Sequence, residues 1–211
     1  MRAAIDHVFI CVQEGAPEAA KLIQFGLREG APNTHPGQGT ANRRFFFHNG
    51  MLELIWVDNP SEAQSEQTRP TMLWERWSTR AGNCPFGIIL GPANDGAVCP
   101  FDAWEYRPEQ MPGLILQIAS KTTLAEPMWA YFARTGRRSA QALDHPNGVR
   151  ELTAVRLHGP VLPDTSVTTA MARDGVIGWQ SPAEHLLELE FDGGRSGRCA
   201  DCRPDLPLIC R

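Results

Sequence analysis

The chain has 211 residues, of which 42% are hydrophobic and 21% charged, and its formal net charge is −4. This composition allows a buried core, in one large domain or two small modules. The net charge is mildly negative and the sequence contains no stripe of basic residues, which argues against nucleic-acid binding. No apolar run approaches the roughly 20 residues that a membrane-spanning helix needs. Because the N-terminus also lacks the pattern of a signal peptide, we expect a cytoplasmic protein without membrane contact.

Short β-rich runs dominate the chain, with a few helical segments between them. In chain order the pattern predicts strands at residues 5–12, 28–33 (weakly marked), 43–48, 51–57, 85–91, 103–107, 114–119, 149–158 and 185–192, and helices at residues 18–25, 72–78 and 164–175, the last one capped by Asp164. Residues 126–135 are compatible with a helix or a strand, and residues after 192 are expected to form a tail. The first 58 residues therefore have the order β-α-β-β-β.

The hairpin at residues 43–57 contains the first candidate functional residue. Asn49-Gly50 between two β-rich runs predicts a tight turn in which both residues have positive φ. Alternation in the second strand places Glu53 on the face opposite to Leu52 and Leu54. A carboxylate on a mostly apolar face costs free energy unless it is paired, hydrogen-bonded or bound to a metal. We therefore expect Glu53 to have a partner or a ligand.

His7 lies in the middle of the first strand, on the face that also carries Phe9 and Cys11. A histidine on an apolar face is more often a satisfied core residue than a metal ligand. Residues from other strands must decide between the two interpretations.

The six cysteines include a single C-x-x-C motif at Cys199 and Cys202. A structural zinc would need two further ligands at suitable spacing, and the sequence offers none. In a cytoplasmic protein we expect these cysteines to be free thiols.

Two segments of the chain are similar to each other. Residues 52–56 (LELIW) match residues 187–191 (LELEF), and residues 5–8 have a fainter counterpart at residues 152–155. Internal duplication predicts a pseudo-two-fold structure in which equivalent strands face one shared cavity.

His7, the β-α-β-β-β unit that ends on Glu53, and the stretches HPGQGTANRRFFF, WEYRP, HPNG and RPDLPL together resemble the glyoxalase-like proteins of the vicinal oxygen chelate superfamily. The resemblance spans nearly the whole chain. It implies an α+β fold in which two βαβββ modules form a curled sheet cup within a single domain. Residues 1–58 would be the first module, residues 59–144 connecting strands and loops, and residues 145–211 the second module, irregular and with inserted strands.

The resemblance also implies a divalent metal ion, bound by one residue from the first and one from the last strand of each module. Carried over, these positions are His7, Glu53 and Glu188, and the fourth falls on Ala154, which cannot bind metal; His158 or His145 could take its place. Such a site suits Fe, Mn, Ni or Zn. The ion would bind two adjacent substrate oxygens and polarise a carbonyl, with Glu188, Glu190 or His145 as groups that move a proton.

Further residues are candidates for contact with a substrate. They come from the Gly-rich loop, the strand after it and the WEYRP stretch: His35, Gln38, Thr40, Asn42, Arg43, Trp104 and Arg107. The arginines could hold an anionic group, because a guanidinium matches a carboxylate with two hydrogen bonds. Surface or core roles explain the same residues equally well.

Two functional hypotheses remain open. The first is a metal-dependent lyase, isomerase or dioxygenase that acts on a small oxygenated molecule. The second is a metal-free pocket that binds a small molecule for sequestration or sensing. A scaffold with a vestigial pocket stays as a third alternative, because a fold does not imply a function. The superfamily also contains many dimers, so a homodimer is one expected assembly.

Overall fold

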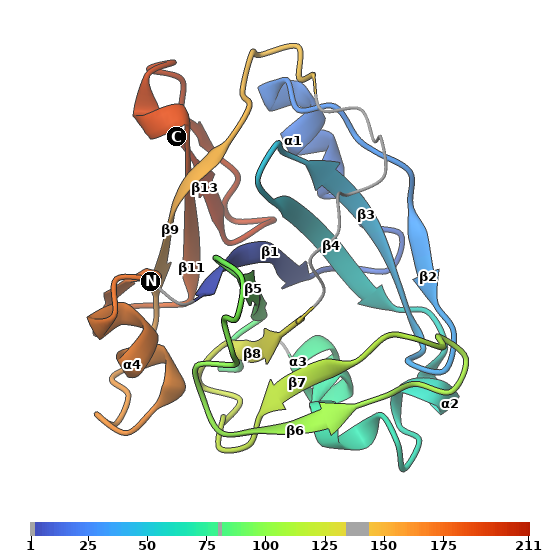
Figure 1. The fold of residues 1–211 in the computed structure, drawn as a ribbon. Helices are drawn as coiled ribbons and strands as arrows, with labels where there is room; N and C mark the ends of the chain where they lie inside the picture. The colour runs from blue at the N-terminus through green and yellow to red at the C-terminus, as the bar shows by residue number, and fades with distance from the viewer. Residues whose placement is uncertain (1–2, 80–81, 134–143) are drawn as a thin grey trace.

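The computed structural model describes residues 3–79, 82–133 and 144–211. These residues form two β-sheets that share one core, with short helices at the sheet edges (Figure 1). No helix in the described part of the chain is long and apolar enough to span a membrane.

The larger sheet, called sheet A, has eight strands in the order β2-β3-β4-β1-β5-β8-β7-β6. Its elements and those between them are β1 (Ala3–Cys11), α1 (Ala19–Phe25), β2 (Asn33–His35), β3 (Thr40–Phe46), β4 (Met51–Val57), α2 (Pro60–Ala63), the 3-10 helix η1 (Arg69–Thr71), α3 (Leu73–Ser78), β5 (Phe86–Pro92), β6 (Ala103–Tyr106), β7 (Leu116–Ala119) and β8 (Met128–Tyr131).

Sheet A consists of two four-stranded units with the same topology. In the first unit β1 is parallel to β4, and in the second β5 is parallel to β8. The other strands of each unit pair antiparallel, in the order β4-β3-β2 and β8-β7-β6. The units meet where β1 runs antiparallel to β5. The α+β class and the two-unit sheet predicted from the resemblance are therefore present.

The second unit lies elsewhere in the chain than expected. It comprises β5 to β8, within residues 86–131, whereas the internal repeat and the family resemblance placed it in residues 145–211. The LELxF echo at residues 187–191 is a pattern that suits any half-buried strand, so it did not identify the equivalent strand. Strand pairing decides equivalence, and the loop at residues 93–102 takes the place that α1 has in the first unit.

Residues 145–211 form a separate five-stranded sheet, called sheet B, in the order β10-β9-β11-β13-β12. Its elements are β9 (Leu152–His158), α4 (Val167–Arg173), β10 (Gly178–Gln180), β11 (Leu186–Phe191), the 3-10 helix η2 (Asp192–Gly194), β12 (Ala200–Asp201) and β13 (Leu208–Cys210). The expected C-terminal tail is thus partly a strand pair whose β13 extends the sheet beside β11.

Most other elements were predicted close to their actual bounds, and residues 126–135 contain strand β8. The weakly marked strand at residues 28–33 was misplaced, since it shares only Asn33 with β2. The predicted N-cap of α4, Asp164, is wrong. The N-cap is Ser166, whose side chain accepts the N–H of Thr169 at 3.1 Å. Serine is a favoured N-cap because its hydroxyl satisfies a free N–H of the first helical turn. The very short strands β10, β12 and β13 were missed, since two or three residues carry no periodicity.

The two faces of sheet A have different roles because side chains alternate along each strand. One face carries Val8, Ile10, Leu52 and Leu54, all completely buried, in a core cluster shared with sheet B. The opposite face carries Phe9, Ile55, Ile89, Tyr106 and Met128, which form a second apolar cluster. His7 and Glu53 belong to this second face.

The turn at residues 47–50 connects the two sheets. Neither Asn49 nor Gly50 has a positive φ, so the predicted turn type is wrong. The Asn49 side chain instead accepts the N–H of Leu152 at 2.9 Å and donates to its carbonyl at 2.7 Å. His48 N–H adds a bond to the carbonyl of Arg150 at 2.8 Å. The turn is shaped by this contact with β9 more than by its own residue preferences.

We predict that Asn49→Ala lowers the free energy of unfolding by about 1–3 kcal/mol, because it leaves the backbone groups of Leu152 without their partners. Urea unfolding of the wild type and the variant measures this difference. Asn94→Ala, on an exposed loop, is the control and should change stability by less than about 0.5 kcal/mol. Equal stability of the wild type and Asn49→Ala would contradict this role of the turn.

Candidate functional site

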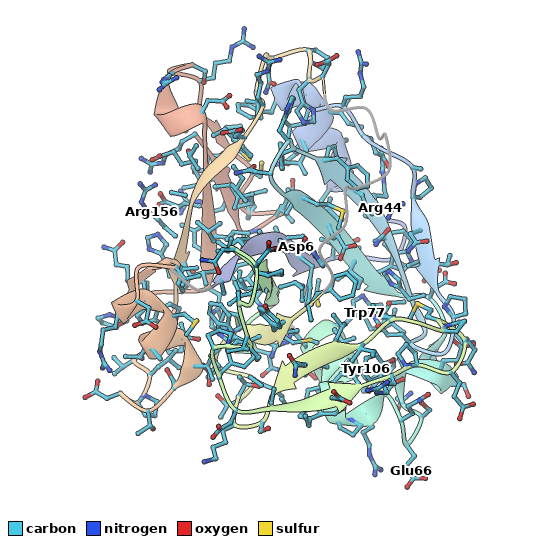
Figure 2. The ribbon with its side chains drawn as sticks, viewed as in Figure 1. Asp6, Arg44, Glu66, Trp77, Tyr106 and Arg156 are labelled. Carbon is cyan, nitrogen blue, oxygen red and sulfur yellow. The ribbon has the colours of Figure 1, made fainter. Side chains whose placement is uncertain are left out.

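The candidate site is a cavity of about 140 Å³ on the face of sheet A that points away from sheet B; we call it the cup. Its polar lining residues are His7, His35, Gln38, Glu53 and Thr71. The rest of its lining is apolar, with Tyr106 at the position marked in Figure 2 and the side chains Phe9, Ile55, Leu73, Ile89, Leu114, Leu116, Met128 and Phe132. The cup therefore combines an apolar body with one polar end.

His7 is oriented by the residue before it in the chain. Its Nδ1 lies 2.6 Å from a carboxylate oxygen of Asp6, and an irregularity in the β1–β5 pairing occurs at this point. Because a carboxylate accepts, Nδ1 carries the hydrogen and Nε2 of the neutral ring is an acceptor. This Nε2 lies 3.8 Å from Oε2 of Glu53, a distance too long for a hydrogen bond.

Glu53 is held from its other side. Asn42 donates through its Nδ2 to Oε1 of Glu53 at 2.8 Å, and the Oδ1 of Asn42 accepts the N–H of Asn33 at 3.0 Å. Only 6% of Glu53 is exposed. Asn42 thus fixes the carboxylate so that Oε2 faces His7. Of the two carboxylate oxygens, Oε1 has the hydrogen-bond partner that the sequence predicted for this buried acid.

A second polar group in the cup is built around Thr40. Its hydroxyl accepts from Nε2 of Gln38 at 2.9 Å and lies 2.9 Å from Nδ1 of His35. Burial lowers the pKa of His35 below the usual value for histidine, so its ring is neutral near pH 7. Of the residues predicted to contact a substrate, His35 and Gln38 line the cup, while Thr40 and Asn42 act by positioning other side chains.

The donor set of the cup does not fit the four-ligand metal centre that the superfamily implies. His7 Nε2 and Glu53 Oε2 are two suitable donors, but the second unit offers Ile89, which pairs with His7 in register, and Met128. The described residues contain no group of three or more His, Cys, Asp or Glu side chains that could hold a metal ion. The segments outside the described residues contain none of these four residue types.

Glu188 does not join His7 and Glu53, which corrects the predicted metal set. It lies on β11 of sheet B, where Oε1 is 3.1 Å from Nε2 of His158 and Oε2 is 3.3 Å from Nε of Arg211. Ala154, the predicted fourth position, lies on β9 of the same sheet. The separation follows from the location of the second unit, because β9 and β11 are not the counterparts of β1 and β4.

Glu190 and His145 also have structural partners. Glu190 forms an ion pair with Arg156 at 2.8 Å, and Figure 2 shows Arg156 on the outer side of β9, well away from Tyr106. The ring of His145 bridges two backbone groups: Nδ1 accepts the N–H of Arg28 at 2.9 Å, and Nε2 lies 3.0 Å from the carbonyl of Phe46. With both nitrogens occupied, His145 fastens the first unit to the chain before β9.

The remaining predicted contact residues lie outside the polar end. Arg43 pairs with Glu29 and donates to the carbonyl of Ala16, so its positive charge is balanced by a carboxylate of the protein. Arg107 is exposed and pairs with Glu105 at 2.7 Å. Trp104 packs against the apolar cluster beside the cup. Sequence reasoning missed Asp6, although its place directly before His7 was a usable signal.

Comparison with known proteins agrees with the geometry of sheet A. Residues 5–98 match a protein-family model described as a glyoxalase-like domain, which covers β1 through β5. A crystal structure of a hypothetical protein from Staphylococcus aureus superposes with a TM-score of 0.51 over 100% of this chain and 98% of that chain, at 10% sequence identity. That identity is low enough for the likeness to concern the fold alone. No curated protein matches this chain.

The buried histidines predict a pH dependence of stability. Burial lowers the pKa of His35, His145 and His185 in the folded chain, so near the usual histidine value of about 6.5 the unfolded chain binds more protons. Stability should therefore fall as the pH drops from about 7.5 to about 5.5. Urea unfolding at several pH values measures the slope. His145→Gln should show a shallower slope, and a slope identical to that of the wild type would contradict a contribution from His145.

Proposed function

We infer that this chain carries a glyoxalase-like domain of the vicinal oxygen chelate superfamily at residues 5–98. On this premise, we propose that the cup binds a ring-sized apolar molecule with one hydroxyl group, and that it does so without a resident metal ion. The observation that carries the proposal is the pair of acceptors at the polar end, His7 Nε2 and Glu53 Oε2, which face each other across 3.8 Å.

The size of the cup supports a small ligand. A dry cavity of about 150 Å³ lined by apolar side chains holds a benzene-sized molecule, and the cup has about 140 Å³. Its apolar lining comes from both units of sheet A and from α3. The favourable free energy of binding would arise mainly from burial of the ligand ring.

The polar end supports a hydrogen-bond donor on the ligand. In the neutral tautomer set by Asp6, His7 accepts at Nε2, and the Oε2 of a Glu53 carboxylate accepts as well. A hydroxyl group between them can donate to one acceptor and stay within reach of the other. A carbonyl group at this position would meet two acceptors, so the geometry of His7 and Glu53 favours alcohols and phenols over ketones and aldehydes.

Proton transfer on such a ligand is the second candidate function. A carboxylate on Nδ1 and a free Nε2 aimed at the ligand are the arrangement that a histidine base uses, and Asp6 provides it at 2.6 Å. His7 would remove the proton and Glu53 would stabilise the imidazolium that forms. This step gives the lyase or isomerase alternative a chemical basis that needs the residues of this chain alone.

We predict that the purified, tag-free protein contains less than about 0.1 equivalent of Mn, Fe, Ni or Zn by elemental mass spectrometry, because the described residues have no group of three His, Cys, Asp or Glu side chains placed to hold a metal ion, and structural and catalytic sites use at least three ligands. His7→Ala and Glu53→Gln should have the same low content. Near-stoichiometric metal in the wild type that both variants lose would overturn the metal-free proposal and favour a metal-dependent enzyme.

We predict that phenol binds the wild type and raises its melting temperature, and that benzene, which lacks the hydroxyl, binds more weakly. His7→Asn and Glu53→Gln should each weaken phenol binding by about tenfold or more, because each alters one partner of the hydroxyl. Titration calorimetry measures both ligands.

Glu151→Gln, a change at an exposed position outside the cup, is the matched control and should bind phenol like the wild type. Equal affinities of all variants for phenol, or a preference for benzene, would contradict the proposed polar end.

A further inference from the structure

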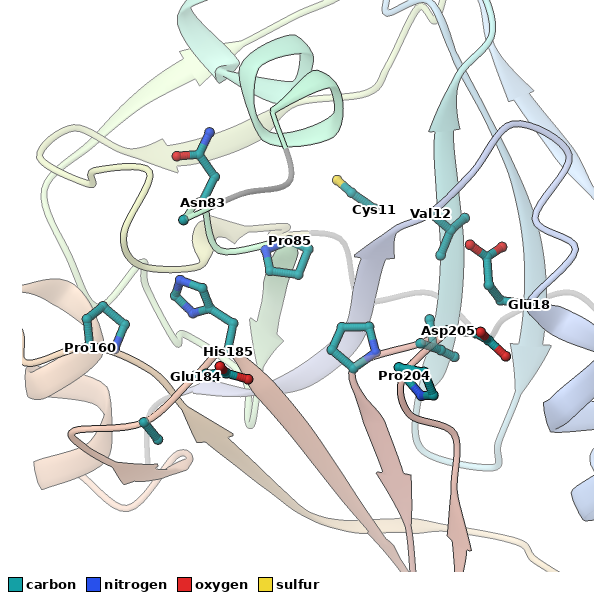
Figure 3. A pocket seen from close by; sticks show the side chains of 14 residues that line it. Cys11, Val12, Glu18, Asn83, Pro85, Pro160, Glu184, His185, Pro204 and Asp205 are labelled. Atoms are coloured by element: carbon teal, nitrogen blue, oxygen red, sulfur yellow. The ribbon is translucent and has the colours of Figure 1, made fainter.

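A second and larger cavity, which we call the inter-sheet cavity, has a volume of about 530 Å³. Its walls come from the end of β1, the start of α1, the chain before β5 and the loops that precede β11 and β13. Figure 3 shows Glu18 and Asp205 on one side of it and Glu184 and His185 on the other. Of its lining residues only Cys11 belongs to a strand of sheet A, and none lines the cup.

The lining of this cavity is acidic. It contains three carboxylates, from Glu18, Glu184 and Asp205, and no lysine or arginine. His185 does not offset them, since burial lowers the pKa of its ring and leaves it neutral near pH 7. Lys21 pairs with Asp205, so Glu18 and Glu184 are the two carboxylates whose charge gives this concave surface a negative potential that favours cations.

Glu18 is the buried member of this group. Only 5% of the residue is exposed, and its Oε1 accepts the N–H of Gln13 at 3.2 Å. Its Oε2 is buried and has no hydrogen-bond partner in the described structure. A buried carboxylate oxygen without a donor costs free energy. This unpartnered oxygen could accept a hydrogen bond from a ligand in the cavity.

The nearest cation on the same helix is already paired with another carboxylate of the cavity, at some distance from the unpartnered oxygen of Glu18. Lys21 lies one turn after Glu18, and its Nζ forms an ion pair with Asp205 at 2.8 Å. At the other end of the cavity, Arg76 lies behind the wall, where it is fully buried and donates to the carbonyls of Cys84 and Glu126. A cationic ligand should therefore place its charge at the Glu18 end.

We propose that the inter-sheet cavity binds a small protonated organic amine with an apolar body, whose ammonium group donates to Glu18. The body would pack on the apolar walls, which include Val12, Pro85, Pro160 and Leu206. The cavity holds a larger molecule than the cup does, and this site is independent of the function proposed for the cup.

Three probes with the same ring and different charges test the proposal. Tryptamine is a cation, tryptophol is its neutral alcohol and indole-3-propionate is an anion. We expect tryptamine to bind most tightly and the propionate most weakly, by at least tenfold between the two, in calorimetric titrations at pH 7. Added salt should weaken tryptamine binding more than tryptophol binding.

Variants locate the site. Glu18→Gln keeps the acceptor for Gln13 and removes the charge, so it should weaken tryptamine binding at least tenfold and leave tryptophol unchanged. Glu184→Gln and Asp205→Asn should each reduce tryptamine binding two- to fivefold, and they decide the outcome if Glu18→Gln does not fold. Glu151→Gln, outside both cavities, is the control.

His7→Asn separates this site from the cup, because it should weaken phenol binding and leave tryptamine binding intact. Equal affinity for the three probes, or full tryptamine affinity in Glu18→Gln or in both other acidic variants, would overturn the proposal. Loss of tryptamine binding in His7→Asn with no loss in the acidic variants would assign the amine to the cup and overturn it as well.

Discussion

The antiparallel pairing of β1 with β5 is the contact on which the rest of the structure depends. It joins two four-stranded units into one sheet and places them around a shared face. The pairing changes register between Ile5 and His7, where Asp6 reaches the ring of His7. One face of the joined sheet is covered by sheet B, so the other face remains for the cup. The cup thus lies on the face of sheet A that does not pack against sheet B.

Buried polar groups in this protein divide into those that are satisfied and those that keep an unused atom. His145 uses both ring nitrogens on backbone groups, and Glu188 is held by His158 and Arg211. Glu53 is also buried and His7 is partly buried, and both are oriented by neighbours, but one atom of each points into a cavity without a bond between them. Because these two atoms face the cavity and have no protein partner, they mark where a ligand is expected better than residue type does.

The two cavities differ in the chemistry that they offer. The cup is small and mostly apolar, and Glu53 is the one carboxylate in its lining. The inter-sheet cavity is larger and is lined by three carboxylates. They lie on different parts of the fold, one on the free face of sheet A and one where its strand ends approach the loops of sheet B (Figure 3). Residues 145–211, which form sheet B, lie outside the matched residues 5–98 and supply part of the wall of the inter-sheet cavity.

The sequence by itself determined most of the longer strands, the class of the fold and the faces of the first unit on which His7 and Glu53 lie. Period-two alternation placed Glu53 opposite to Leu52 and Leu54, and it placed His7 beside Phe9; both pairs of faces are as predicted. It could not determine which later strands complete the sheet, because LELxF at residues 187–191 and the apolar strand β8 are equally compatible with a central position. Pairing between distant strands depends on the total burial of both faces, and only the tertiary structure decided that β5 and β8 lie beside the first unit while Glu188 lies in another sheet.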